Sequence, residues 1–226
     1  MVEIRIPKIA VILCGCGSMD GSEIHEATFT LLSIDELGAE YKCFALDKPQ
    51  GRVMDFVTGT EEPTEKRNQL KESARISRGK IQNIVDLKVN DFDALILPGG
   101  YGAAFNLCDF AKLGENASVD PEIKRVLTQF HEAQKPIGAI CISPAIVALV
   151  LGKSAKPSIT IGEVNDPVAE KLRKLDCEVI ASQTNDCVID IKNKIVTTPA
   201  YMNAKRISEV RQGIAKLTAA VLELVT

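Results

Sequence analysis

Three short apolar runs constrain the fold of this 226-residue chain more than any other feature. They are KIAVILC at residues 8–14, DALIL at 93–97 and KPIGAIC at 135–141, and each is followed by glycines or a proline-containing turn. Their apolar residues are consecutive rather than alternating, which is typical of strands that are buried on both faces. Such strands occur in parallel sheets with helices on either side. The runs therefore predict an α/β fold.

A helical pattern lies between the first two strands that we expect. Apolar residues recur at helical spacing from residue 24 to 37, and Gly38 ends the pattern. Asp20, with Glu23 three residues later, resembles a capping box at the start of this helix. A further strand at 41–46 completes a strand–helix–strand unit, whose crossover should be right-handed.

The remaining pattern extends the same architecture to the end of the chain. We expect helices at 64–78, 121–133, 143–151, 167–175 and 204–224, and strands at 158–161, 177–181, 187–191 and 194–198. The predicted fold class is a flavodoxin-like, mostly parallel sheet with helices on both faces. The length fits one domain over residues 1–226. The polar stretch 47–90, with its helix, is expected to be an inserted excursion from that domain.

Composition excludes several classes of protein. The 27 Lys and Arg residues nearly balance 30 Asp and Glu, so we expect no nucleic-acid or membrane partner. Seven cysteines without a C-x-x-C motif, and only two histidines, argue against a disulfide scaffold or a metal site. The N-terminal segment lacks the pattern of a signal peptide, and the longest apolar stretch is too short to span a membrane. These features predict a reduced, cytoplasmic protein.

A nucleophile elbow is indicated where the third apolar run ends. Cys141 stands between Ala139 and Ser143, and small residues in these places let a strand turn sharply into a helix. The helix N-terminus would favour a thiolate at an exposed Cys141. The amide of Ile142, with one from the Pro98–Gly102 loop (Gly99 or Gly100), could bind an oxyanion. The alternative is that Cys141 is a small buried apolar residue, and spacing alone leaves both open.

Four segments carry a resemblance to a known family. GCGSMDGSEIHEA, NDFDALILPGGYGAAFNL, CISPA and NKIVTTPAYM resemble the ThiJ/PfpI superfamily, and within it the ElbB-type branch, which is described as glyoxalase-like and as supporting isoprenoid biosynthesis. The resemblance covers nearly the whole chain. It implies a glutamine amidotransferase-like fold and a homodimer, and we expect the protein to use no cofactor.

The resemblance also implies roles for individual residues. Cys141 matches the nucleophile of the superfamily, and Glu26 matches the glutamate that hydrogen-bonds its sulfur and moves protons. Gly100 and Ile142 match the amides that bind an oxyanion. Many members place a histidine after the elbow, but no histidine follows His131 in this chain. Without that base, peptidase or glutamine amidotransferase activity is not expected.

Four further residues are candidates for the pocket. His25 adjoins Glu26, but neighbours on a helix point about 100° apart, so it should bind substrate or anchor a loop rather than catalyse. Cys16 could be a resolving thiol for Cys141 if their Cα atoms come within roughly 4.4–6.8 Å. Pro199 and Tyr201 follow the last strand, in a turn that the resemblance implies lies close to Cys141, and we expect Tyr201 to line the pocket.

Two functions follow from this reasoning. The first is a cofactor-independent cysteine enzyme of the glyoxalase or deglycase type, whose substrate is a small aldehyde and which converts glyoxal to glycolate. The second is a non-enzymatic redox-sensing or binding protein that uses the same Cys141 and is linked to isoprenoid metabolism. Dependence on Glu26 would separate them.

Overall fold

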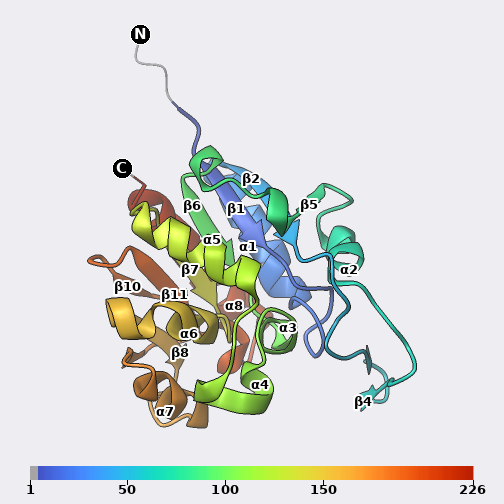
Figure 1. The fold of residues 1–226 in the computed structure, drawn as a ribbon. Helices are drawn as coiled ribbons and strands as arrows, with labels where there is room; N and C mark the ends of the chain where they lie inside the picture. Colours follow the sequence, from blue (N-terminus) through green and yellow to red (C-terminus); the bar gives the residue numbers. More distant parts are fainter. Residues whose placement is uncertain (1–4, 226) are drawn as a thin grey trace.

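The computed structural model describes residues 5–225 and contains eleven strands in that range. The strands are β1 Lys8–Ile12, β2 Glu40–Ala45, β3 Met54–Asp55, β4 Thr60–Glu61, β5 Ile81–Asn83, β6 Ala94–Leu97, β7 Ile137–Ile140, β8 Ser158–Gly162, β9 Glu178–Ala181, β10 Val188–Asp190 and β11 Ile195–Thr198. Seven of them form a central sheet in the order β10-β11-β7-β6-β1-β2-β5 (Figure 1). Within it β10 pairs antiparallel with β11, and the other pairs are parallel. The predicted fold class is confirmed.

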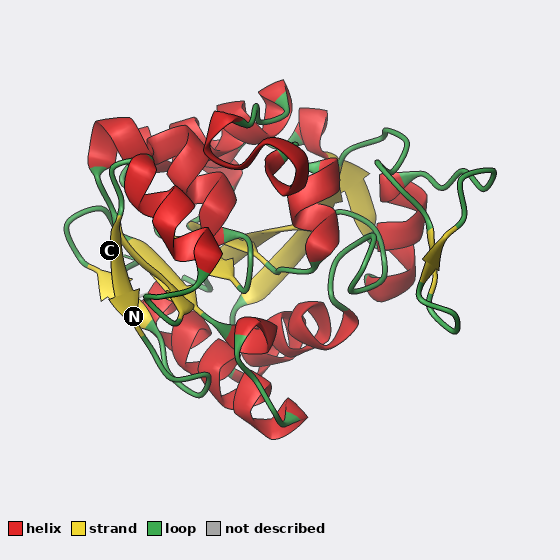
Figure 2. Ribbon diagram, turned by 90° about the horizontal axis from the view of Figure 1, so that it is seen from below, coloured by secondary structure: helices red, strands yellow, loops and turns green. Residues whose placement is uncertain are grey.

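Helices cover both faces of this sheet (Figure 2). They are α1 Ile24–Glu36, α2 Gln69–Ile76, α3 Tyr101–Asn106, α4 Phe110–Leu113, α5 Pro121–Glu132, α6 Pro144–Ala155, α7 Pro167–Lys174 and α8 Ile207–Glu223, with short 3₁₀ turns η1 Ile84–Asp86, η2 Val89–Asp91, η3 Gly114–Asn116 and η4 Ala200–Met202. On one face α1 packs against α8, and on the other α5 packs against α6. Every residue of β6, β7 and β11 is therefore buried, and for β6 and β7 the consecutive apolar runs predict this.

The first helix begins later than its predicted capping box. Glu23, not Asp20, is the N-cap of α1, and its Oε2 accepts a hydrogen bond from the Glu26 N–H at 2.7 Å. The Asp20 Oδ2 accepts instead from the Met54 N–H at 2.9 Å. Asp20 thus links the β1–α1 loop to a segment far along the chain, a contact that local spacing does not reveal.

The polar stretch 47–90 packs over the loop that follows β1. Arg52 donates two hydrogen bonds to the Met19 carbonyl, and Gln50 Nε2 donates one to the Asp20 carbonyl. The hairpin of β3 and β4 extends away from the sheet, whereas β5 pairs with β2 and becomes its edge strand (Figure 1). The helix predicted at 64–78 is shorter, because Asn68 caps α2 at Gln69. The single-domain organisation stays a prediction.

Two strands near the C-terminal half form a small sheet of their own. β8 and β9 pair in parallel and do not join the central sheet. Their helix α7 is placed beside η3 and α6, which brings its first turn toward the carboxyl ends of the central strands. No helix between residues 5 and 225 is long and apolar enough to cross a bilayer. Residues 1–4 of the N-terminal segment lie outside the described residues.

Candidate active site

Cys141 occupies a strained turn between β7 and α6. Its φ is +61°, in the left-handed region that non-glycine residues seldom adopt. The Cys141 N–H donates to the Thr198 carbonyl at 2.9 Å, and the Ser143 hydroxyl donates to the Pro98 carbonyl at 2.8 Å. These bonds to the ends of β11 and β6 hold the turn in place. The predicted nucleophile elbow is therefore present.

Glu26 of α1 lies against the Cys141 sulfur and is fully buried. Its Oε2 accepts a hydrogen bond from the Gly99 N–H at 3.0 Å, and its Oε1 accepts one from the Tyr201 N–H at 3.2 Å. The carboxyl also hydrogen-bonds the sulfur of Cys141. A Cβ at position 99 would lie 2.4 Å from the Cys141 Cβ and 2.6 Å from the Glu26 Oε2. Only glycine therefore fits between the two functional side chains.

Burial and charge set the proton affinities of this pair. Burial, followed by the nearby charge of Glu23, raises the pKa of Glu26 to about 8. Burial, followed by the charge of Glu26, raises the pKa of Cys141 well above its ordinary value of 9.0. The Glu26 carboxyl is thus protonated at neutral pH. While it keeps this proton, it can donate a hydrogen bond to the sulfur, which favours a thiolate at Cys141. Once the carboxyl ionises, its charge opposes the thiolate.

The resting state of Cys141 differs from the exposed thiolate that the sequence predicts. The side chain is 8% exposed, so desolvation outweighs the effect of the helix N-terminus on its pKa. The local pattern indicates the elbow correctly, but burial depends on loops that are remote in sequence. Cys141 is accordingly a protonated thiol beside a protonated carboxyl at neutral pH.

Two backbone amides near the sulfur are candidate oxyanion donors. The N–H groups of Gly100 and Ile142 contact the Cys141 sulfur and oppose the rise in its pKa. The φ of Gly100 is +101°, and a Cβ there would lie 2.4 Å from the Glu23 nitrogen. The Gly99 N–H, by contrast, is bonded to Glu26. The N–H of Gly99 is therefore not available to an oxyanion. The N–H groups of Gly100 and Ile142, which the resemblance implied, are better placed to bind one.

A cavity of about 300 Å³ opens at the Cys141 sulfur. Tyr201 lines it as predicted, together with Gly100 and Ile142. Its other lining residues are ones that sequence reasoning did not assign to the site: Ser18, Glu23, Tyr101, Asp166, Val168 and Met202. Tyr101 lies in the recognised glycine loop, so its place could have been predicted. Asp166 and Val168 come from the start of α7, and only the tertiary fold brings them here.

Three predicted pocket residues lie outside this cavity. Cys16 does not line the cavity, and its thiol feels the charges of Glu72 and Arg75 of α2, so its role as a resolving thiol stays a prediction. His25 Nδ1 is 2.7 Å from the Tyr201 hydroxyl, which makes His25 an anchor for the wall of the cavity. Pro199 is the N-cap residue of η4, the turn that carries Tyr201.

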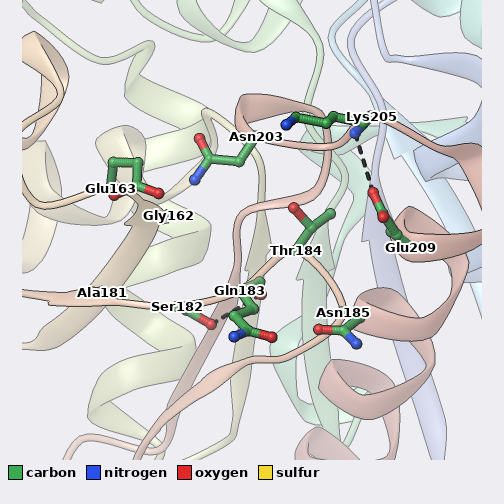
Figure 3. A pocket seen from close by; sticks show the side chains of 10 residues that line it. All are labelled: Gly162, Glu163, Ala181, Ser182, Gln183, Thr184, Asn185, Asn203, Lys205 and Glu209. Atoms are coloured by element: carbon green, nitrogen blue, oxygen red, sulfur yellow. Dashed lines mark hydrogen bonds between the residues drawn. The ribbon is translucent and has the colours of Figure 1, made fainter.

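A larger cleft of about 490 Å³ lies between the small sheet and the start of α8 (Figure 3). Its lining is mostly uncharged and polar, including Gln183, Asn185 and Asn203, with Lys205 and Glu209 at one end. Glu209 is occupied in capping α8, where its Oε2 accepts from two backbone N–H groups. No cysteine lines the cleft, and among residues 5–225 no cluster of three His, Cys, Asp or Glu side chains could hold a metal ion. The reactive groups are therefore concentrated at Cys141.

Comparison with known proteins shows relatives along nearly the whole chain. An ES1 protein homolog, mitochondrial, of Rattus norvegicus is 41% identical over 225 residues, which cover 96% of this chain and 84% of the relative. The glutamine amidotransferase-like class 1 domain-containing protein 3, mitochondrial, of Homo sapiens is 40% identical and is covered to 83%. No family profile matches the chain.

A solved structure supports the same relationship. An isoprenoid biosynthesis protein with an amidotransferase-like domain from Ehrlichia chaffeensis superposes with a TM-score of 0.89 at 39% identity, covering 96% of this chain and 99% of that one. A ThiJ/PfpI domain protein from Brachyspira murdochii and glyoxalase III from Candida albicans superpose with TM-scores of 0.59 and 0.61, at 13% and 14% identity. These distant likenesses show the fold alone.

The predicted cytoplasmic location is wrong. The relatives from rat, human and Danio rerio are all named mitochondrial proteins. Free thiols and an average composition suit any reducing compartment, so they do not distinguish the cytoplasm from an organelle.

The identities of 40% and 41% over more than four fifths of two relatives, and the shared structure, establish the wider relationship. The chain belongs to the ES1 and glutamine amidotransferase-like class 1 domain family, within the ThiJ/PfpI-like fold.

Proposed function

We propose that this protein is a cofactor-independent enzyme that converts small 2-oxoaldehydes, such as glyoxal, into hydroxy acids at Cys141. The observation that carries the proposal is the buried hydrogen bond between Cys141 and a Glu26 whose pKa is raised to about 8. A carboxyl of this kind can both give and take a proton near neutral pH. Perturbed carboxyls beside a nucleophile in a cavity are typical of catalytic sites.

The reaction would begin by addition of the sulfur to one carbonyl of glyoxal. A C–S bond forms, the thiol proton passes to the carbonyl oxygen, and the product is a hemithioacetal. The N–H groups of Gly100 and Ile142 would stabilise the developing oxyanion. Glu26 lies beside the sulfur, so its carboxylate can reach the hydrogen on the carbon that the sulfur attacks.

Glu26 would then transfer a proton between neighbouring carbons. Removing the carbon-bound hydrogen gives an enediol, and returning a proton to the second carbon gives a thioester of glycolate. Water hydrolyses the thioester, releases glycolate and restores the Cys141 thiol. The overall change adds one water to glyoxal and needs no external oxidant or reductant. A single carboxyl suffices, which is consistent with the absence of a histidine after His131.

A redox-sensing role at Cys141 has less support. Oxidation by peroxide requires an accessible thiolate, whereas Cys141 is 8% exposed and its pKa is raised.

The name of the Ehrlichia relative links that protein to isoprenoid biosynthesis, and a carbonyl-processing role for this chain is compatible with such a link. A homodimer is likewise a proposal, which sedimentation of the purified protein would test.

The experiment is to measure glycolate formed from glyoxal by the purified protein, by Cys141→Ser and by Glu26→Gln. Both variants should fall to background, while Glu36→Gln, on the exposed side of the same helix, should match the unchanged protein. If the protein is no faster than free thiol at the same concentration, the proposal is wrong. Full activity in Glu26→Gln would refute the role of the carboxyl.

A further inference from the structure

A second cavity of about 340 Å³ adjoins the one at Cys141. The two share Tyr101, Ile142 and Val168 as lining residues, and Ile142 directly follows the nucleophile. A ligand whose carbonyl lies at the sulfur can therefore extend past these three side chains. Glyoxal, with two carbons, would fill only a small part of this combined space. The site is built for a longer molecule.

Two cations line the second cavity among apolar side chains. The Arg52 Cζ lies 4.0 Å from the centre of the Phe105 ring, and the guanidinium Nε and Nη2 both donate to the Met19 carbonyl. Stacking and hydrogen bonds therefore fix the plane of the group. Its Nη1 has no hydrogen-bond partner among the described residues, so this edge of Arg52 is free to bind a ligand.

Lys171 of α7 provides the second cation. Its Nζ lies 5.7 Å from the centre of the Phe110 ring. Within residues 5–225, no carboxylate is within ion-pair distance of Lys171 or of Arg52. Lys174, one turn later on the same helix, is different, because it pairs with Glu115 at 2.9 Å. Glu115 feels the charge of Lys171 as well, but its hydrogen bond is to Lys174. Neither cation of the second cavity forms an ion pair with a described residue.

The carboxyl groups lie at the other end of the combined space. Glu23 and Asp166 line the cavity at Cys141, whereas no acidic residue lines the second one. Asp20 feels the charge of Arg52, but its carboxyl hydrogen-bonds the Met54 N–H instead. An anion is therefore repelled near the sulfur and attracted near Arg52 and Lys171. This polarity orients a ligand that carries charge at one end.

We propose that the second cavity binds the carboxylate or phosphate of a substrate whose reactive carbonyl lies at Cys141, joined to it by a short apolar chain. The position of the carbonyl at Cys141 rests on the proposed function, whereas the anion site rests on the second cavity alone. Arg52 and Lys171 are its specificity residues, and Tyr101 and Val168 enclose the connecting chain. The preferred substrates are anionic 2-oxoaldehydes rather than glyoxal itself.

The test uses probes that lack a reactive carbonyl, so that binding is measured without turnover. Hexanoate, hexyl phosphate and the uncharged hexanamide are titrated calorimetrically into the full-length protein, Arg52→Gln, Lys171→Gln and the control Lys174→Gln. We expect at least one anion to bind about tenfold more tightly than hexanamide, and each cavity variant to lose about that preference. Lys174→Gln and hexanamide binding should be unchanged. The two anions distinguish a carboxylate from a phosphate site.

Equal affinity for hexanamide and both anions would overturn the proposal, as would an equal loss in Lys174→Gln. Lys171 lies on a helix surface, so its variant keeps the test valid if Arg52→Gln disturbs the Met19 loop. Anion preference without glyoxal turnover would refute the proposed reaction and leave the anion site supported. Turnover without anion preference would refute the anion site alone.

Discussion

Replacing Glu26 by glutamine should make the stability of the protein less dependent on pH. In the folded state burial raises the pKa of Glu26 from its ordinary value of 4.5 to about 8. A group with a raised folded pKa contributes stability that is fully present below the unfolded pKa and is lost as the pH rises through the folded one. The window is therefore about pH 4.5 to 8. Glutamine does not ionise and is free of this penalty.

The size of the effect follows from the two pKa values. At about 1.36 kcal/mol for each pH unit, a rise from 4.5 to about 8 corresponds to roughly 5 kcal/mol at most. Glutamine offers one oxygen to the N–H groups of Gly99 and Tyr201, so one donor is left unsatisfied at a cost of about 1–3 kcal/mol. That cost does not vary with pH. The free energy of unfolding of the variant minus that of the natural protein should thus rise by about 1 kcal/mol per pH unit from pH 5 to 8.

Urea unfolding of both proteins at pH 5, 6, 7 and 8 provides the measurement. Glu36→Gln is the matched control, because its carboxyl is exposed on the same helix and pairs with Arg211. Its difference from the natural protein should show no comparable slope over this range. A flat difference for Glu26→Gln as well would show that Glu26 ionises normally in the folded protein, and the reasoning would fail.

Three further experiments test neighbouring parts of the site. Gly99→Ala should abolish turnover and lower the free energy of unfolding by about 1–3 kcal/mol in urea titrations, because its Cβ would overlap Cys141; near-normal activity would contradict the packing. Glu26→Gln should speed alkylation of Cys141 by iodoacetamide at pH 9, since a charge that opposes the thiolate is removed; an unchanged or slower rate would argue against that opposition. Tyr201→Phe loses the bond to His25 but keeps the N–H to Glu26, so glyoxal turnover should fall less than tenfold. Complete loss would show that the Tyr201 hydroxyl, or the His25 ring bonded to it, takes part in catalysis.

The sheet could be predicted from sequence because consecutive apolar runs are a local property. The runs at 8–14, 93–97 and 135–141 became β1, β6 and β7, and their carboxyl ends meet where the predicted elbow lies. The helical pattern from residue 24 matches α1, but its capping residue was predicted wrongly, since Asp20 has a distant partner in Met54. Local pattern does not encode such pairings.

The site was predictable only in part for the same reason. Cys141 and Glu26 could be found, because an elbow motif and a family resemblance mark them. Burial of Cys141 and the place of Asp166 depend on how α7 and the small sheet fold against the main one. Arg52 lies in the polar excursion with no motif around it, and only its contacts with Met19 and Phe105 bring it to the site.

Turnover of glyoxal beside dideuterated glyoxal tests the central claim most directly. Glu26 is proposed to remove a carbon-bound hydrogen, so the deuterated substrate should give glycolate at least about twofold more slowly. Both rates should exceed that of free thiol at the same concentration. Equal rates for the two substrates would contradict proton removal by Glu26, and a rate no higher than that of free thiol would contradict the proposed reaction altogether.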